Sequence, residues 1–183
     1  MGIVFQLGGG PKQQQDEELR GFAESLGLKF GRATKSEGPQ LRGVIDGHKI
    51  RVRTSRLGRC EIEVDYDSGL RSFSIYERSL DVRTNRVEIN TEDADFDTRF
   101  RTFTGADTEE AALLNFLTEQ RRQVIRAIGE VFTIHKIKDD EFEVHLPEDP
   151  AVETLRDAID FCVNAAKALD QSQAPQDALR PAA

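Results

Sequence analysis

The sequence predicts an α+β domain in which an antiparallel sheet, a four-stranded meander plus a later hairpin, packs against two or three helices. Three observations indicate this class. Apolar and polar residues alternate with a period of two from about residue 41 to 77, and again from 131 to 146. Apolar residues recur at helical spacing in three other stretches. A chain of 183 residues can bury a substantial core, and two full domains would be crowded in it.

The first helix is predicted over residues 13–26, where Gly27 supplies the usual terminating glycine. We expect a flexible N-terminal segment at 1–12, which contains a run of three glycines, a single domain at 13–170, and a disordered tail at 171–183. The tail is rich in Gln, Ala and Pro and shows no hydrophobic periodicity.

The meander begins with a two-residue turn at Asp46-Gly47, which sets Leu41 opposite Val52. If the next loop spans 55–59, apolar residues of the second and third strands face one another. The same register then pairs opposite charges on the other face: Lys49 with Asp65, Arg51 with Glu63, and Arg53 with Glu61. A Ser68-Gly69 turn is expected to add the fourth strand, with Phe73 opposite Val64 and Ile75 opposite Ile62.

Short strands are predicted around Val87 to Ile89 and Phe100 to Phe103. A second helix is predicted from Asp107, with a capping-box-like start, to Gly129, which would terminate it. A second hairpin follows at 131–137 and 141–146, and we expect it to join the main sheet. A third helix is predicted to begin at Pro150, with Asp149 as its N-cap, and to end near Asp170.

Composition restricts the classes of partner. The net charge of −8 argues against a chain-wide nucleic-acid or acidic-membrane surface, because phosphate binding needs clustered positive charge. Cys60 and Cys162 lack metal or disulfide spacing, which favours a reducing compartment. No apolar run approaches the roughly 18 residues of a membrane span. We expect a cytoplasmic protein whose partner is another protein, with a homodimer through the third helix as the alternative.

A local basic strip is the first candidate site. Three of its arginines, Arg42, Arg56 and Arg59, have no partner in the predicted charge ladder and could bind an anion or nucleic acid. The ladder itself is the competing interpretation of the strip, and no aromatic residues interleave with the basic ones as single-strand binding requires.

Two clusters could bind a metal. Asp93, Asp95 and Asp97 match the opening of a calcium loop, but Thr98 and Thr104 stand where the loop needs glycine and glutamate. His135, Glu143 and His145 lie on one face of the second predicted hairpin and could give two nitrogens and one oxygen to a transition metal. A solvated strand face is the competing interpretation. The sequence carries no nucleophile motif or phosphate loop, so we assign no catalytic residue and no cofactor.

The segment Asn90 to Phe100 resembles a pattern of uncharacterised bacterial proteins, T-G-D-x-x-F-D-x-x-F before a Leu-rich helix, although Glu92 stands where that pattern has glycine. The resemblance spans about 26–170 and implies no activity. The expected order of helix, strands, helix, hairpin and helix, with an acidic pI, is also similar to small acidic type III secretion chaperones, which hold an extended partner chain. We therefore expect a chaperone- or adaptor-like, non-catalytic binding module. A metal-dependent or metal-binding domain and an anion-binding domain are the alternatives.

Overall fold

The computed structural model describes residues 12–34, 38–54, 59–146 and 150–170. In these ranges nine strands form one antiparallel sheet in the order β1-β2-β3-β4-β9-β8-β5-β7-β6. The strands are β1 Lys29–Gly31, β2 Gln40–Ile45, β3 His48–Thr54, β4 Cys60–Asp65, β5 Phe73–Glu77, β6 Val87–Ile89, β7 Phe100–Thr104, β8 Thr133–Lys138 and β9 Glu141–Leu146. The mixed α/β class is confirmed, and the sheet is larger than predicted.

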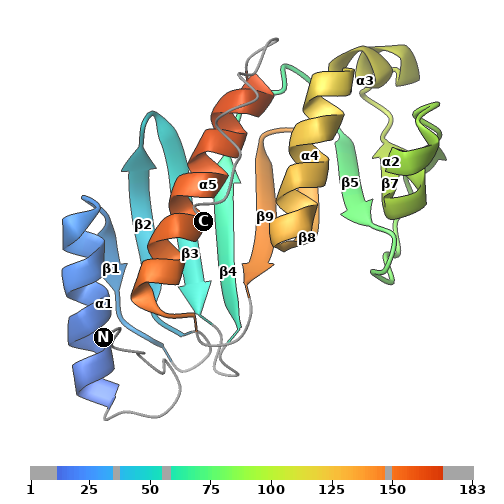
Figure 1. Ribbon diagram of the computed structural model, residues 1–183. Coiled ribbons are helices and arrows are strands. Elements are labelled where there is room, and N and C mark those ends of the chain that lie inside the picture. Colours follow the sequence, from blue (N-terminus) through green and yellow to red (C-terminus); the bar gives the residue numbers. More distant parts are fainter. Residues whose placement is uncertain (1–11, 35–37, 55–58, 147–149, 171–183) are drawn as a thin grey trace.

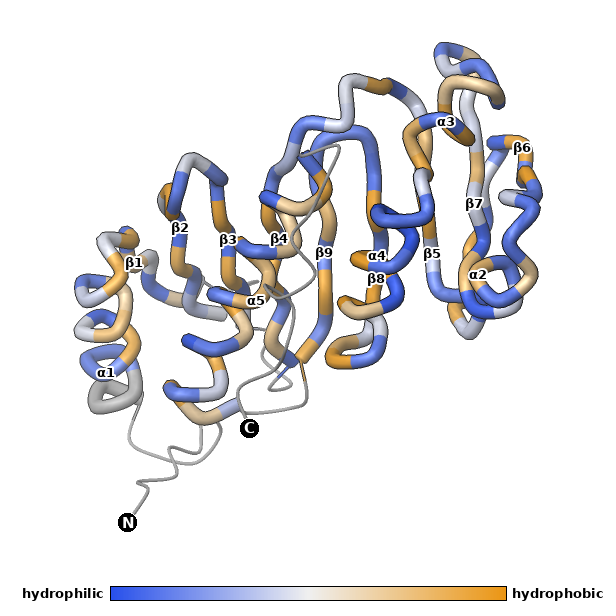
Figure 2. The backbone as a smooth tube through the Cα atoms, turned by 45° about the horizontal axis from the view of Figure 1, so that its top comes forward, coloured by the Kyte–Doolittle hydropathy of each residue, from blue (hydrophilic) through white to orange (hydrophobic). Residues whose placement is uncertain are grey.

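The helices are α1 Lys12–Ser25, α2 Ala94–Arg99, α3 Glu110–Phe116, α4 Glu119–Val131 and α5 Val152–Asp170. Figure 1 shows α1, α5 and α4 lying across the same face of the sheet. The core lies between this face and the helices, where Ile62 and Val144 of the central strands and Ile159 of α5 are fully buried. Figure 2 shows hydrophobic and hydrophilic residues alternating along the central strands, so the other face of the sheet is polar.

The predicted register of the first three long strands is confirmed. Leu41 faces Val52 across β2 and β3, and Ile50 faces Val64 across β3 and β4. All three predicted ion pairs form: Arg51 Nη1 lies 2.8 Å from Glu63, Arg53 Nε lies 3.4 Å from Glu61, and Lys49 Nζ lies 3.8 Å from Asp65. Side chains of a strand point alternately to the two faces of the sheet, so the same register aligns the apolar residues on one face and the opposite charges on the other.

Exchanging Arg51 for Glu is expected to lower the free energy of unfolding, and adding Glu63→Arg is expected to restore part of the loss. The coupling energy should be about 0.5–1 kcal/mol, because Arg51 is partly exposed and water screens the pair. Recovery is incomplete because Arg53 also lies 3.3 Å from Glu63. Urea denaturation of the two single variants and the double variant measures the coupling. Strictly additive losses would contradict a contribution of this pair to stability.

The predicted fourth strand of the meander is wrong. Beside β4 lies β9, with Val64 opposite Phe142 and Ile62 opposite Val144. The second hairpin therefore inserts into the sheet, and β5 pairs with β8 on its far side. After the Ser68-Gly69 turn the chain does not return beside β4. It crosses the end of the inserted hairpin and enters β5 on the far side of that hairpin.

The β8–β9 turn holds this crossing segment. Both carboxylate oxygens of Asp139 accept hydrogen bonds, from the backbone N–H groups of Ser72 and Phe73, each at 2.7 Å. The Tyr66 hydroxyl donates to the carbonyl oxygen of Lys138. These bonds fix where β5 begins, and they join residues about seventy positions apart, which a search for local turns cannot find.

The predicted helix from Asp107 to Gly129 is two helices. It breaks at Leu117 and Thr118, where the Thr118 side chain caps α4 by accepting a hydrogen bond from Arg121 N. Gly129 does not terminate α4, which continues to Val131. A Cβ at Gly129 would lie 2.9 Å from Arg99 Nη2, and Arg99 donates a hydrogen bond to the Gly129 carbonyl. The glycine therefore permits a close contact between α4 and the Arg99 side chain.

The region between β6 and β7 contains α2, which was not predicted. The Asp93 side chain caps this helix by accepting a hydrogen bond from Phe96 N. The preceding residue, Glu92, has a φ of 61°, in the left-handed region that favours glycine. The short strands predicted at Val87–Ile89 and from Phe100 are present as β6 and β7.

Candidate functional site

The polar face of the sheet, opposite α5 and α4, is called the open face and carries bands of charge that follow the strands. Its basic band on β3 consists of Lys49, Arg51 and Arg53, and its acidic band spans two neighbouring strands, β4 and β9. A second basic band on β8 contains Lys136 and Lys138, which contact Glu141 at 3.1 and 3.2 Å. The predicted three-pair ladder is thus one half of a network that continues across β9.

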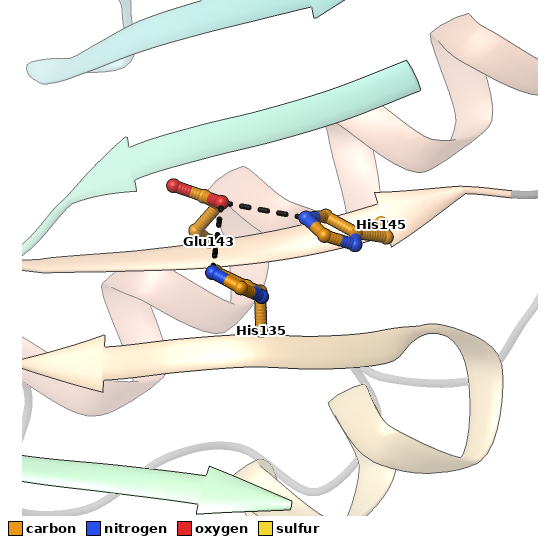
Figure 3. Close-up of side chains that lie close together, drawn as sticks. All are labelled: His135, Glu143 and His145. Carbon is orange, nitrogen blue, oxygen red and sulfur yellow. Dashed lines mark hydrogen bonds and ion pairs between the residues drawn. The ribbon is translucent and has the colours of Figure 1, made fainter. Parts of the chain in front are cut away.

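Glu143 lies at the centre of this network, and its side chain is only 7% exposed. Its oxygen Oε2 contacts two cations, Arg53 Nη2 at 3.2 Å and Lys136 Nζ at 3.3 Å. Its oxygen Oε1 faces two imidazoles, with His145 Nε2 at 3.4 Å and His135 Nε2 at 3.9 Å. Figure 3 shows both histidine rings directing a nitrogen toward the same carboxylate oxygen.

A β-bulge brings Lys136 into this cluster beside His135. Across β8 and β9, Ile134 pairs with Val144, but the next pair is Lys136 with Glu143, so His135 is the extra residue. A bulge of this kind turns two consecutive side chains toward one face of a sheet. Both His135 and Lys136 consequently contact Glu143, while Ile134 and Ile137 are both buried in the core.

The two imidazoles stack, with ring centroids 4.6 Å apart and an interplanar angle of 15°. His145 Nε2 also lies 3.8 Å from Glu61 Oε1, so a second carboxylate borders the pair. Potential ligand atoms of His135, Glu143 and His145 all lie within 4.8 Å of one another. In the described part of the chain this is the one group of three His, Cys, Asp or Glu residues arranged in this way.

The electrostatic environment sets the protonation of these groups. Burial raises the pKa of Glu143, but the hydrogen bond from His145 and the charges of Lys136 and His135 outweigh it and lower the pKa to about 2. Burial lowers the pKa of His135, and the attraction of Glu143 offsets only part of that effect. At neutral pH Glu143 is therefore a carboxylate and His135 is uncharged.

A hollow of about 600 Å³ lies near the β2–β3 turn. Val44 lines it with a side chain that is 58% exposed. The charged residues around Val44 have both signs: Arg42, Lys49, Arg51, Glu63, Asp65, Asp140 and Glu141. The hollow therefore combines apolar contact area with a mixed rim of charges.

The predicted aspartate cluster is divided among different partners. Asp93 is held by Arg122 Nε at 2.8 Å and by Arg126. Asp97 accepts hydrogen bonds from the backbone N–H and the hydroxyl of Thr91, and Asp95 is exposed in the first turn of α2. Asp93, Asp95 and Asp97 thus act at the start of a helix, and the charge of Asp93 is neutralised by two arginines from α4.

Of the three predicted anion-binding arginines, Arg56 lies outside the described residues. Arg42 donates a hydrogen bond to the Gln40 side chain, and Arg59 is exposed just before β4. Both cysteines are buried. Burial raises the pKa of the Cys60 thiol to about 12 and raises that of Cys162 still further, so neither is a thiolate nucleophile at neutral pH.

Sequence reasoning missed the contributions of Arg53, Lys136 and Glu61 to the environment of Glu143. One signal was present in the sequence, because two polar residues separate Ile134 from Ile137 where strict alternation would allow one. That interruption of the period is typical of a bulge. The pairing of β4 with β9, which brings Arg53 and Glu61 to this cluster, has no such local signal.

This arrangement defines a mixed α/β protein whose described residues form a nine-stranded antiparallel sheet, with its long helices on one face. No family model matches the chain, and no curated protein matches it in sequence. Among solved structures, the crystal structure of the mycobacterial trehalose monomycolate transport factor A, TtfA, is similar, with a TM-score of 0.58. The comparison covers 92% of this chain and 97% of that one at 9% sequence identity, and thus shows a shared fold. No helix in the described residues has the length and apolar character needed to cross a membrane.

Proposed function

We propose that this protein is a non-catalytic binding protein that holds an extended segment of another protein on the open face of its sheet. The observation that carries the proposal is the hollow around Val44, an exposed apolar side chain on the sheet. A partner that covers Val44 removes apolar surface from water, which favours association. The similarity to a transport factor is compatible with an accessory role and specifies no partner.

The charges around the hollow favour a polypeptide over an anion. Three basic residues and four acidic ones line it, so a phosphate near Arg42 would also meet nearby carboxylates. An extended peptide with side chains of both signs can pair with both kinds of group. Anion binding at Arg42, Arg56 and Arg59 is the competing proposal, and it predicts a steep loss of affinity with added salt.

The test uses a photo-crosslinking amino acid in place of Val44 in cells that produce the protein. A matched control carries the same amino acid in place of Asp160, an exposed residue of α5 on the opposite side of the molecule. We expect a discrete crosslinked protein from position 44 and none from position 160. Crosslinks of equal strength at both positions, or at neither, would overturn the proposal.

Binding of the crosslinked partner is then measured with purified proteins by calorimetry. Val44→Asp is expected to weaken binding about tenfold, because it places a charge in the apolar centre of the contact. Asp160→Ala should leave the affinity unchanged. Equal affinities for the wild type and Val44→Asp would show that the partner binds elsewhere. A salt dependence as steep as that of a phosphate-binding surface would favour the anion proposal instead.

A further inference from the structure

We propose that His135, His145 and Glu143 form a binding site for a divalent transition metal ion of the zinc class on the open face. The site is independent of the proposed partner-binding hollow, whose lining contains none of these three residues. Its ligands are the two Nε2 atoms and Oε1 of the glutamate. The geometry of the side chains, their orientation by neighbours and their access to solvent each support the site.

The distances suit a small ion. A tetrahedral zinc ion with ligands at about 2.0–2.1 Å holds its ligand atoms roughly 3.3 Å apart. His145 Nε2 and Glu143 Oε1 are already 3.4 Å apart, and His135 Nε2 lies 3.9 Å from the same oxygen. A shift of about half an ångström in His135, the most exposed of the three side chains, brings its Nε2 equally close to Oε1. All candidate ligand atoms of the three residues already lie within 4.8 Å of one another. The parallel rings already direct both Nε2 atoms to one side (Figure 3).

The surroundings orient the carboxylate without blocking its ligand atom. Arg53 and Lys136 both contact Oε2 of Glu143, while Oε1 faces the imidazoles. Hydrogen bonds to the second oxygen of a ligating carboxylate are the usual means of fixing its direction, and they matter nearly as much as the ligands. The cluster thus has oriented ligands before any ion arrives.

The donor set determines the class of ion. Two imidazole nitrogens with one carboxylate oxygen favour zinc, copper, nickel or cobalt over magnesium and calcium, which prefer oxygen ligands. Three protein ligands leave one tetrahedral position for water or for Glu61, which lies 3.8 Å from His145 Nε2. An ion can reach the site because His135 is 46% exposed and His145 26% exposed.

The test uses the full chain after treatment with a chelator. A calorimetric titration with zinc chloride should show that one equivalent of zinc binds. A hundredfold excess of magnesium should not compete with it. His135→Gln and His145→Gln should each weaken zinc binding by about a hundredfold. The chain has three histidines, and His48→Gln is the matched control. His48 contacts Asp65 O and Asp170 at the far end of β3 and lies outside the cluster.

A readout on individual atoms separates this site from binding elsewhere. In imidazole nitrogen NMR spectra, zinc should shift the Nε2 signals of His135 and His145 and leave those of His48 unchanged. Circular dichroism of each variant verifies that it is folded. Failure of the wild type to bind zinc would overturn the proposal. Binding that persists unchanged in the double variant His135→Gln/His145→Gln would overturn it as well, because the ion would then occupy another place.

Discussion

Replacing Gly38 with alanine is expected to lower the free energy of unfolding by about 3 kcal/mol, the upper part of the range for inserting an atom into a filled space. A Cβ at this position would overlap the carbonyl oxygen of Thr54 and lie 2.8 Å from its carbonyl carbon. The obstacle is backbone, which cannot rotate away as a side chain can. Thr54 N also donates to the carbonyl of Pro39 at 3.1 Å, so relief of the clash would break the end of the β2–β3 pairing.

Urea denaturation measures this effect as a lower midpoint with an unchanged slope. Gly21→Ala is the matched control, because Gly21 lies in α1 and a Cβ added there would meet no atom within 4 Å. In a helix interior the same substitution should stabilise the protein by about 0.5–1 kcal/mol. Equal midpoints for Gly38→Ala and the wild type would show that residues 38 and 54 do not approach so closely.

Asp93→Asn is expected to destabilise the protein by about 2 kcal/mol at neutral pH, between the values for exposed and fully buried ion pairs. Asparagine is also a good N-cap, so the start of α2 is retained and the loss reports on charge. Arg122 and Arg126, whose side chains are 18% and 24% exposed, would lose the less exposed of the two carboxylates that pair with both and would keep Glu119. The contact between α2 and α4 should therefore weaken.

The effect should depend on pH in a defined direction. Partial burial raises the pKa of Asp93, but the hydrogen bond from Phe96 N and the charges of Arg126 and Arg122 lower it more, to below its usual value. A lowered folded-state pKa gives stability that is complete above the unfolded pKa and is lost as pH falls through the folded one. The difference in free energy of unfolding between the wild type and Asp93→Asn should accordingly reach its full value above about pH 5 and disappear in stronger acid.

Asp95→Asn provides the control for this prediction. Asp95 is exposed in the same helical turn, and its substitution should change stability by only a few tenths of a kcal/mol, about the size of a helix-dipole effect. Thermal or urea unfolding of the three proteins from pH 7 to pH 2.5 measures both effects. If Asp93→Asn lowers the free energy of unfolding by the same amount across this pH range, the ion pairs of Asp93 with α4 do not stabilise the fold.

The sequence by itself determined the β2–β3–β4 register. The Asp46-Gly47 turn sets the β2–β3 register. Between β3 and β4, the predicted register places apolar pairs on one face and opposite charges on the other. The amphipathic stripe of α5 was equally readable, because a helix that covers a sheet repeats its apolar residues every three or four positions. The sequence also placed His135, Glu143 and His145 on one face of a hairpin.

Only the tertiary structure decided where that hairpin lies. Its insertion between β4 and β5 depends on contacts of Asp139 and Tyr66 with residues about seventy positions away, and no local pattern encodes such contacts. The insertion places β4 beside β9, and thereby brings Arg53 and Glu61 to Glu143 and His145. Side-chain periodicity specifies which face a residue occupies, whereas the partner strand across that face is chosen by long-range packing.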